Sequence, residues 1–117
     1  MYKIVVTDPA QKDLQNTVSY ISNELKNKQA AINLLDLVED TVKSLTVMPE
    51  RYAVVDDEIL SREGFRFIPI KIYLLFCIVR KNIQTVVIQR FLYARRGWMN
   101  ILKINYFEDI AKCINSL

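Results

Sequence analysis

Residues 64–102, GFRFIPIKIYLLFCIVRKNIQTVVIQRFLYARRGWMNIL, decide the fold, because they hold three strand-like segments in close succession. The segments are rich in β-branched and aromatic residues, which favour strands, and they cover residues 65–70, 72–80 and 84–93. Their short connections predict an antiparallel meander, with Lys81 and Asn82 as a hairpin turn. Pro69 has no backbone N–H, so the first of these strands is expected near a sheet edge or at a strand end.

The residues before this stretch predict a strand followed by two helices. Residues 2–7, YKIVVT, have the composition of a first strand. Asp8 is expected as the N-cap of a helix and Pro9 as its first residue, with Gln11 completing a capping box. Apolar residues then recur at helical spacing over two segments, about 9–26 and 29–48. Two amphipathic helices so closely connected are expected to form a hairpin that packs on a sheet.

Together these segments predict an α+β fold with an N-terminal strand, an α-helical hairpin, an antiparallel β-meander, about four strands in all, and a C-terminal helix. Residues 50–63 are interpreted as a loop with a turn of helix near residues 57–60, and residues 94–102 as a short helix. Residues 103–117 repeat apolar side chains at helical spacing. We expect one domain over residues 1–102, with 103–117 as a helical tail of the same domain.

The last strand carries much of the interpretation. Strict alternation along residues 84–93 would place Phe91 and Tyr93 on one face, and Ile88, Arg90 and Leu92 on the other. The sheet would then end beside a run of basic residues, a surface suited to phosphates or carboxylates.

Composition bounds the class of protein. The chain has 117 residues, 51% of them hydrophobic, and its 16 Lys and Arg against 13 Asp and Glu give a net charge of +3. This mild excess of basic residues does not by itself identify a partner. Cys77 and Cys113 are expected to be reduced thiols, because a chain with so large an apolar fraction needs no disulfide. The N-terminal apolar run is too short for a signal peptide and no run is long enough to span a membrane, so we expect a cytoplasmic protein.

Four motifs stand out along the chain: TDPAQKDLQNTVSYI at 7–21, SLTVMPERY at 44–52, GFRFIPI at 64–70 and RFLYARRGW at 90–98. These motifs and the order of elements resemble the RelE/ParE superfamily of toxins from type II toxin–antitoxin pairs. The resemblance covers residues 2 to about 102 and implies a growth-inhibiting toxin. Members of the superfamily cleave mRNA on the ribosome or bind DNA gyrase, so the resemblance leaves two different chemistries to weigh.

Alignment with the nuclease branch finds several of its functional residues replaced. Leu74 stands where that branch has an arginine in the third strand, Tyr93 stands at a histidine position, and Gly97 stands at an aspartate position. Leu102 lies where one subgroup has a terminal tyrosine, although Tyr106 is about one turn away. RNA cleavage needs a proton acceptor and cations at the scissile phosphate, so the catalytic set looks incomplete.

The remaining residues favour binding over cleavage. A tyrosine hydroxyl without a neighbouring cation is a poor general base near neutral pH. If the chain were a nuclease, its metal-independent catalytic set would be Arg66, Tyr93 (or Tyr106) and Arg96. As a binding surface we predict five residues, with Lys71 in reserve: Arg66, Arg90, Arg95, Arg96 and Trp98.

Each of these residues also has a structural alternative. Arg95 and Arg96 could pair with surface acids such as Glu63, Asp56 or Asp57, Arg66 could serve solubility, and Trp98 could anchor the core. The acidic run at 56–58 is expected to be solvated charge, and we expect no metal and no cofactor.

The leading hypothesis is thus a ParE-like toxin that binds a replication target such as DNA gyrase. The alternatives are a RelE-like mRNA interferase acting on the ribosome, and a non-toxic partner that its antitoxin binds for transcriptional autoregulation. In each case the resemblance implies a cognate antitoxin as partner, in a toxin–antitoxin hetero-oligomer. Its acidic residues would cover the basic surface and its apolar helix would lie against the α-hairpin.

Overall fold

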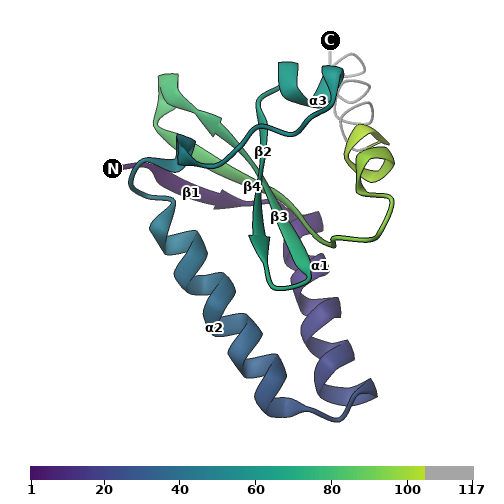
Figure 1. Ribbon diagram of the computed structural model, residues 1–117. Coiled ribbons are helices and arrows are strands. Elements are labelled where there is room, and N and C mark those ends of the chain that lie inside the picture. The colour runs from purple at the N-terminus through teal and green to yellow at the C-terminus, as the bar shows by residue number, and fades with distance from the viewer. Residues whose placement is uncertain (105–117) are drawn as a thin grey trace.

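The computed structural model describes residues 1–104, which form one α+β unit (Figure 1). In chain order its elements are β1 (Lys3–Val6), α1 (Asp8–Ser19), a π-helical turn η1 (Tyr20–Glu24), α2 (Lys28–Ser44), a 3-10 turn η2 (Pro49–Arg51), α3 (Glu58–Arg62), β2 (Phe65–Ile70), β3 (Tyr73–Arg80), a 3-10 turn η3 (Lys81–Ile83) and β4 (Thr85–Tyr93). Residues 98–104 are also helical. The rest of the expected tail helix, with Tyr106 and Cys113, lies outside the described residues.

The four strands form one sheet in the order β1-β4-β3-β2. The predicted antiparallel meander is confirmed, and β2, which contains Pro69, is an edge strand. β1 instead pairs in parallel with β4, from Lys3 opposite Thr85 to Val6 opposite Ile88. The reason is topological: the α-hairpin returns the chain to the far edge of the sheet, and two reversals then bring β4 beside β1 in the same direction.

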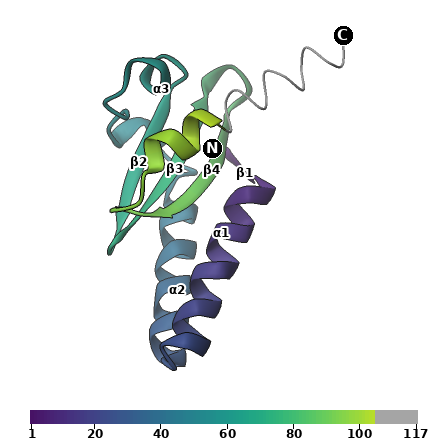
Figure 2. The same cartoon turned by 90° about the vertical axis from the view of Figure 1, so that its right-hand side faces the viewer.

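The sheet is covered on both faces. Figure 2 shows α1 and α2 side by side in the lower half of the molecule, with helix 98–104 above them. On the hairpin face, buried residues of α1, α2 with its C-cap, and all strands except β1 form one apolar cluster: Ala10, Leu34, Val38, Leu45, Ile68, Ile70, Leu75, Cys77, Val86, Ile88 and Phe91. On the opposite face, α3 and helix 98–104 complete a second cluster: Val55, Leu60, Phe65, Phe76, Ile78, Leu92 and Leu102.

Helix α1 begins one residue earlier than the sequence predicts. The N-cap is Thr7 and not Asp8: the Thr7 hydroxyl accepts a hydrogen bond from the Ala10 N–H at 3.2 Å and donates one to the Gln89 carbonyl at 2.9 Å. Thr7 still has the extended backbone of β1, so it can cap the helix while fastening it to β4. The expected helix over 9–26 also ends early, because the chain widens into the π-helical turn η1.

Removing the N-cap should have a measurable but moderate effect. We expect Thr7→Ala to lower the free energy of unfolding by about 1–2 kcal/mol, because the Ala10 N–H and the Gln89 carbonyl both lose a partner. Urea denaturation followed by circular dichroism measures the change. Thr41→Ala is the control, since the Thr41 hydroxyl donates only within α2, to the Leu37 carbonyl. Equal losses of unfolding free energy in both variants would show that the Thr7 cap contributes no more than an ordinary hydroxyl within a helix.

A β-bulge in β4 changes which side chains face each core. Cys77 pairs with Ile88 but Phe76 pairs with Arg90, so Gln89 has no partner on β3. Beyond the bulge the alternation shifts: Phe91 packs with Ile88 on the hairpin face, and Leu92 packs on the other. The sequence prediction of strict alternation along this strand was therefore wrong, because one residue is inserted into the ladder. The two-residue turn expected before β4 was also wrong. The connection is the 3-10 turn η3, and Gln84 closes it with a φ of 48°.

Candidate target-binding site

The basic turn, residues 94–97, directly follows β4. The Ala94 N–H donates to the Ile72 carbonyl at 2.9 Å, and the Arg96 N–H donates to the Tyr93 carbonyl at 3.0 Å. The turn is thereby held against the β2–β3 connection. The side chains of Arg95 and Arg96 are exposed, and among residues 1–104 no carboxylate lies within ion-pair distance of either guanidinium.

Asp57, one of the acids considered as a partner for these arginines, is engaged elsewhere. Its carboxylate caps α3 by accepting from the Ile59 and Leu60 N–H groups at 3.0 and 3.1 Å. It also pairs with the Lys103 ammonium at 2.8 Å, and this contact, followed by the cap, holds the pKa of Asp57 below its ordinary value. The pair links α3 to helix 98–104.

Arg66 is turned into the fold. Its guanidinium donates to the Tyr52 carbonyl at 2.6 Å and the Glu50 carbonyl at 3.2 Å, and lies 4.0 Å from the Glu50 carboxylate. These bonds fasten the segment that follows α2 to the edge strand β2. Arg66 therefore uses much of its hydrogen-bonding capacity on partners within the protein.

Arg90 is also engaged within the fold. Its Nε and Nη2 atoms donate to the two carboxylate oxygens of Asp13 at 2.5 and 2.8 Å, and the same carboxylate accepts from the Phe91 N–H at 3.1 Å. The side chains of Arg90 and Asp13 are only 14% and 10% exposed. This bidentate pair joins α1 to the β-bulge of β4.

Trp98 packs in the second core, with its ring 5.1 Å from that of Phe76, and is half-buried. Lys71 is exposed in the β2–β3 turn, where it has a φ of 56°. Of the predicted binding residues, Arg95 and Arg96 are thus the two whose guanidinium groups are exposed and make no ion pair within residues 1–104.

Arg66 lies apart from the other two residues of the hypothetical nuclease set, Tyr93 and Arg96. Arg66 lies opposite Cys77 on β3, whereas Tyr93 lies opposite Tyr73. Four residues along a strand separate these points, which is roughly 13 Å. Leu74, at the position of the missing cation, is half-buried in the second core, and burial raises the pKa of the Cys77 thiol to about 11. This part of β3 offers neither a cation nor a reactive thiol.

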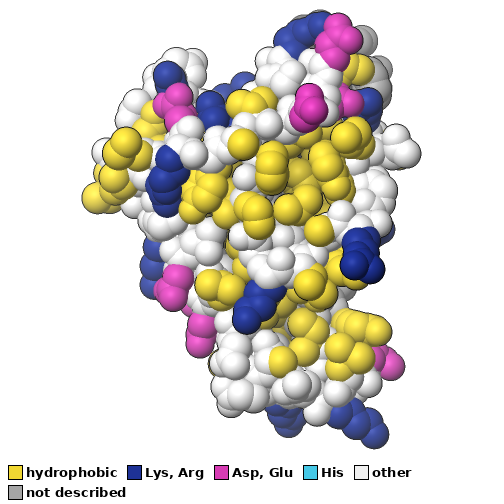
Figure 3. Space-filling view, in the orientation of Figure 1, with side chains coloured by type: hydrophobic (Ala, Val, Ile, Leu, Met, Phe, Trp, Pro, Cys, Tyr) yellow, Lys and Arg dark blue, Asp and Glu magenta, His cyan; other side chains and the backbone are white. Residues whose placement is uncertain are grey.

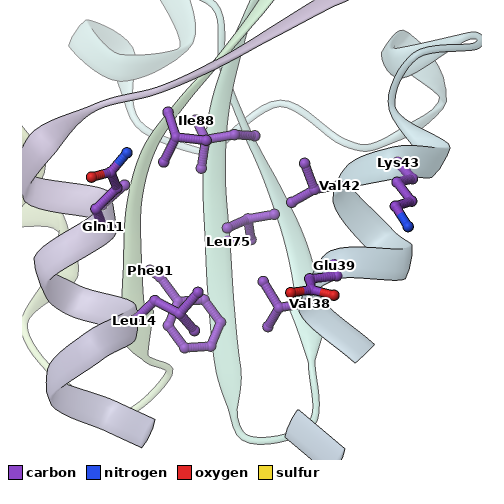
Figure 4. A pocket seen from close by; sticks show the side chains of 11 residues that line it. Gln11, Leu14, Val38, Glu39, Val42, Lys43, Leu75, Ile88 and Phe91 are labelled. Atoms are coloured by element: carbon purple, nitrogen blue, oxygen red, sulfur yellow. The ribbon is translucent and has the colours of Figure 1, made fainter. Parts of the chain in front are cut away.

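A second surface feature, the apolar groove, opens between α1, α2 and the sheet (Figure 4). It has a volume of about 330 Å³, and its lining is almost wholly apolar: Val6, Ala10, Leu14, Val38, Val42, Leu75, Ile88 and Phe91, with Gln11, Glu39 and Lys43. The sequence predicted the apolar stripes of both helices but not that they leave a gap. Whether two stripes meet or stand apart depends on the packing angle, which periodicity does not encode.

The element order and the sheet topology define a small α+β domain of the RelE/ParE type. The family model of the ParE toxin of the type II toxin–antitoxin system, parDE, matches residues 4–98. The chain belongs to this family. No curated protein matches the sequence.

Solved structures share the fold at low sequence identity. The chromosomal ParDE toxin–antitoxin system from P. aeruginosa is 18% identical with a TM-score of 0.65, over 81% of this chain and 98% of that chain. The toxin–antitoxin complex RelBE2 from Mycobacterium tuberculosis is 15% identical with a TM-score of 0.52, over 79% and 96% of the two chains. The intact RelBE complex of E. coli is 15% identical with a TM-score of 0.52, over 82% and 100%. Within residues 1–104, no helix is long and apolar enough to cross a lipid bilayer.

Proposed function

We propose that this toxin inhibits growth by binding a replication enzyme, DNA gyrase, through the basic turn. The observation that carries the proposal is the exposure of Arg95 and Arg96 without carboxylate partners among residues 1–104. Two adjacent guanidinium groups suit bidentate contacts with carboxylates on a protein target. Gyrase is the target that the resemblance to ParE toxins implies.

The same geometry argues against mRNA cleavage as the main activity. Cleavage through a 2′-hydroxyl requires a proton acceptor and cations that converge on one phosphate. Here Arg66 is bound to carbonyls of residues 50 and 52, and Tyr93 lies about 13 Å further along the sheet. A dispersed set of this kind favours a binding toxin.

An antitoxin is the second partner that we propose. The apolar groove is wide enough for side chains from one face of an amphipathic helix, and Glu39 and Lys43 at its border could fix the orientation of that helix. Acidic residues of the same antitoxin would cover the basic turn. Neutralisation would then combine a hydrophobic contact on the hairpin face with charge compensation at the arginines, in a hetero-oligomer in the cytoplasm.

Induced expression of the chain in cells without an antitoxin tests this function. Incorporation of labelled thymidine and labelled leucine is followed from the moment of induction. We expect growth to stop, with DNA synthesis falling before protein synthesis. If protein synthesis stops first, the ribosome-dependent alternative is correct. Normal growth at a verified protein level would favour the non-toxic regulatory alternative.

A further inference from the structure

A second hollow, which we call the tyrosine hollow, lies beside the basic turn and is separate from the apolar groove. It has a volume of about 510 Å³ and is lined by three segments: Asn16, Thr17, Tyr20 and Leu25 from the end of α1, η1 and its C-cap, Ile72 and Tyr73 from the β2–β3 turn and the start of β3, and Tyr93 from the end of β4. Figure 3 shows hydrophobic side chains between the end of the α-hairpin and the sheet, with Lys and Arg side chains around them.

The walls of this hollow expose large apolar side chains. Tyr20, Leu25 and Ile72 are 55%, 57% and 58% exposed, although each is a large hydrophobic side chain. Clustered exposed apolar residues on a small domain mark interaction surfaces, and tyrosine is enriched at the centres of protein interfaces.

In the sequence a basic residue stands next to each wall segment, and one acid, Glu24, also adjoins the first wall. Lys26 follows Leu25, Lys71 precedes Ile72, and Arg95 lies two residues after Tyr93. Lys26 and Lys71 both have a positive φ, of 50° and 56°, so two of the three borders are strained turns of non-glycine residues. The seven lining residues include no acid.

The backbone of the first wall is also unusual. The π-helical turn η1 carries Tyr20 at its start, and Leu25 closes it by donating its N–H to the Tyr20 carbonyl at 3.1 Å. Turns of this type are rare and frequently lie at functional sites. The hollow therefore combines exposed apolar walls, strained borders and neighbouring basic residues, which together point to a binding site.

We propose that the tyrosine hollow receives a bulky apolar side chain from an acidic segment of the toxin's protein target, next to the carboxylates bound by Arg95 and Arg96. The inference rests on the proposed function, and it identifies the hollow as one part of the target-binding surface. Charge complementarity favours this occupant, because Lys26, Lys71 and Arg95 adjoin the three wall segments in the sequence and the seven lining residues include no acid. The walls favour a side chain over a nucleobase, since Leu25 and Ile72 are aliphatic and the Tyr73 ring already stacks on Phe91 at 5.1 Å.

The test places a carboxylate in the hollow. Ile72→Asp is compared with Ile32→Asp, a matched control on α2 that is 52% exposed and does not line the hollow. Tyr20→Ala is a second variant that removes apolar surface without adding charge. Unfolding of each purified variant is measured, and each is then assayed for inhibition of supercoiling by DNA gyrase, for mRNA cleavage in a translating extract, and for growth arrest. We expect Ile72→Asp and Tyr20→Ala to inhibit gyrase about 30-fold more weakly than the unmodified chain, and Ile32→Asp to inhibit it equally well.

The outcomes separate this inference from the proposed function. If gyrase is inhibited equally by all variants, the tyrosine hollow has no role and the gyrase proposal stands. If the unmodified chain arrests growth without affecting gyrase or cutting mRNA, and Ile72→Asp abolishes the arrest, gyrase is the wrong target and the hollow stands. Specific mRNA cuts that disappear in Ile72→Asp would assign the hollow to a nucleic acid and overturn the inference.

Discussion

Reversing both charges of the basic turn, in the variant Arg95→Glu/Arg96→Glu, is expected to abolish growth arrest and to weaken target binding by about 100-fold or more. Each arginine would lose a charge-assisted contact with a carboxylate of the target. Each new glutamate would then face that carboxylate across the interface and repel it. The fold should be unaffected, because both side chains are exposed and make no ion pair among residues 1–104. Survival of induced cells and the affinity for gyrase measure the effect.

The control for this variant must change the net charge by the same amount at another place. Lys12→Glu/Arg62→Glu does so at exposed positions on α1 and α3. We expect it to arrest growth as strongly as the unmodified chain. A similar loss of toxicity in both double variants would mean that total charge matters and that the basic turn is not a specific site.

Truncating the buried carboxylate, in Asp13→Ala, is expected to lower the free energy of unfolding by about 3–5 kcal/mol. The loss leaves the Arg90 guanidinium, which is 14% exposed, without its partner, and leaves the Phe91 N–H without an acceptor. It also releases the contact that fixes α1 against the bulge in β4. Chemical denaturation measures the change as a shift in midpoint at constant slope.

A double variant shows how the energy of this pair is divided. In Asp13→Leu/Arg90→Met no buried charge is left alone, so we expect it to recover a large part of the stability lost in Asp13→Ala. A loss below about 1 kcal/mol in Asp13→Ala would instead be typical of an exposed ion pair, and would contradict the structural role given to Asp13.

The elements that follow periodic patterns were predictable, and the irregular ones were not. The meander could be predicted from three strand-like runs with short turns, and α2 from an apolar stripe that ends before Pro49. The π-helical turn was missed because Ile21 and Leu25 keep the spacing of an ordinary helix. The bulge at Gln89 was missed because a single inserted residue leaves the local composition of a strand unchanged.

Some features of the candidate site were also predictable from the sequence, and others were not. The position of Arg95 and Arg96 beyond the last strand could be predicted, since the strand boundary fixes where the turn begins. The partner of Arg90 could not, because Asp13 lies on a helix near the other end of the chain and looks in the sequence like any polar residue on a solvated face. The tyrosine hollow was missed for a similar reason: its three walls come together only in the folded chain.

We propose that this ParE-family toxin acts by binding through the basic turn and not by cutting RNA. The most direct measurement is supercoiling of relaxed plasmid by DNA gyrase at increasing toxin concentration, beside primer extension on mRNA in a translating extract. We expect supercoiling to fall with the unmodified chain and to persist with Arg95→Glu/Arg96→Glu, and we expect the mRNA to stay intact with both. Full supercoiling at every toxin concentration, together with specific cuts in the mRNA, would contradict the proposal.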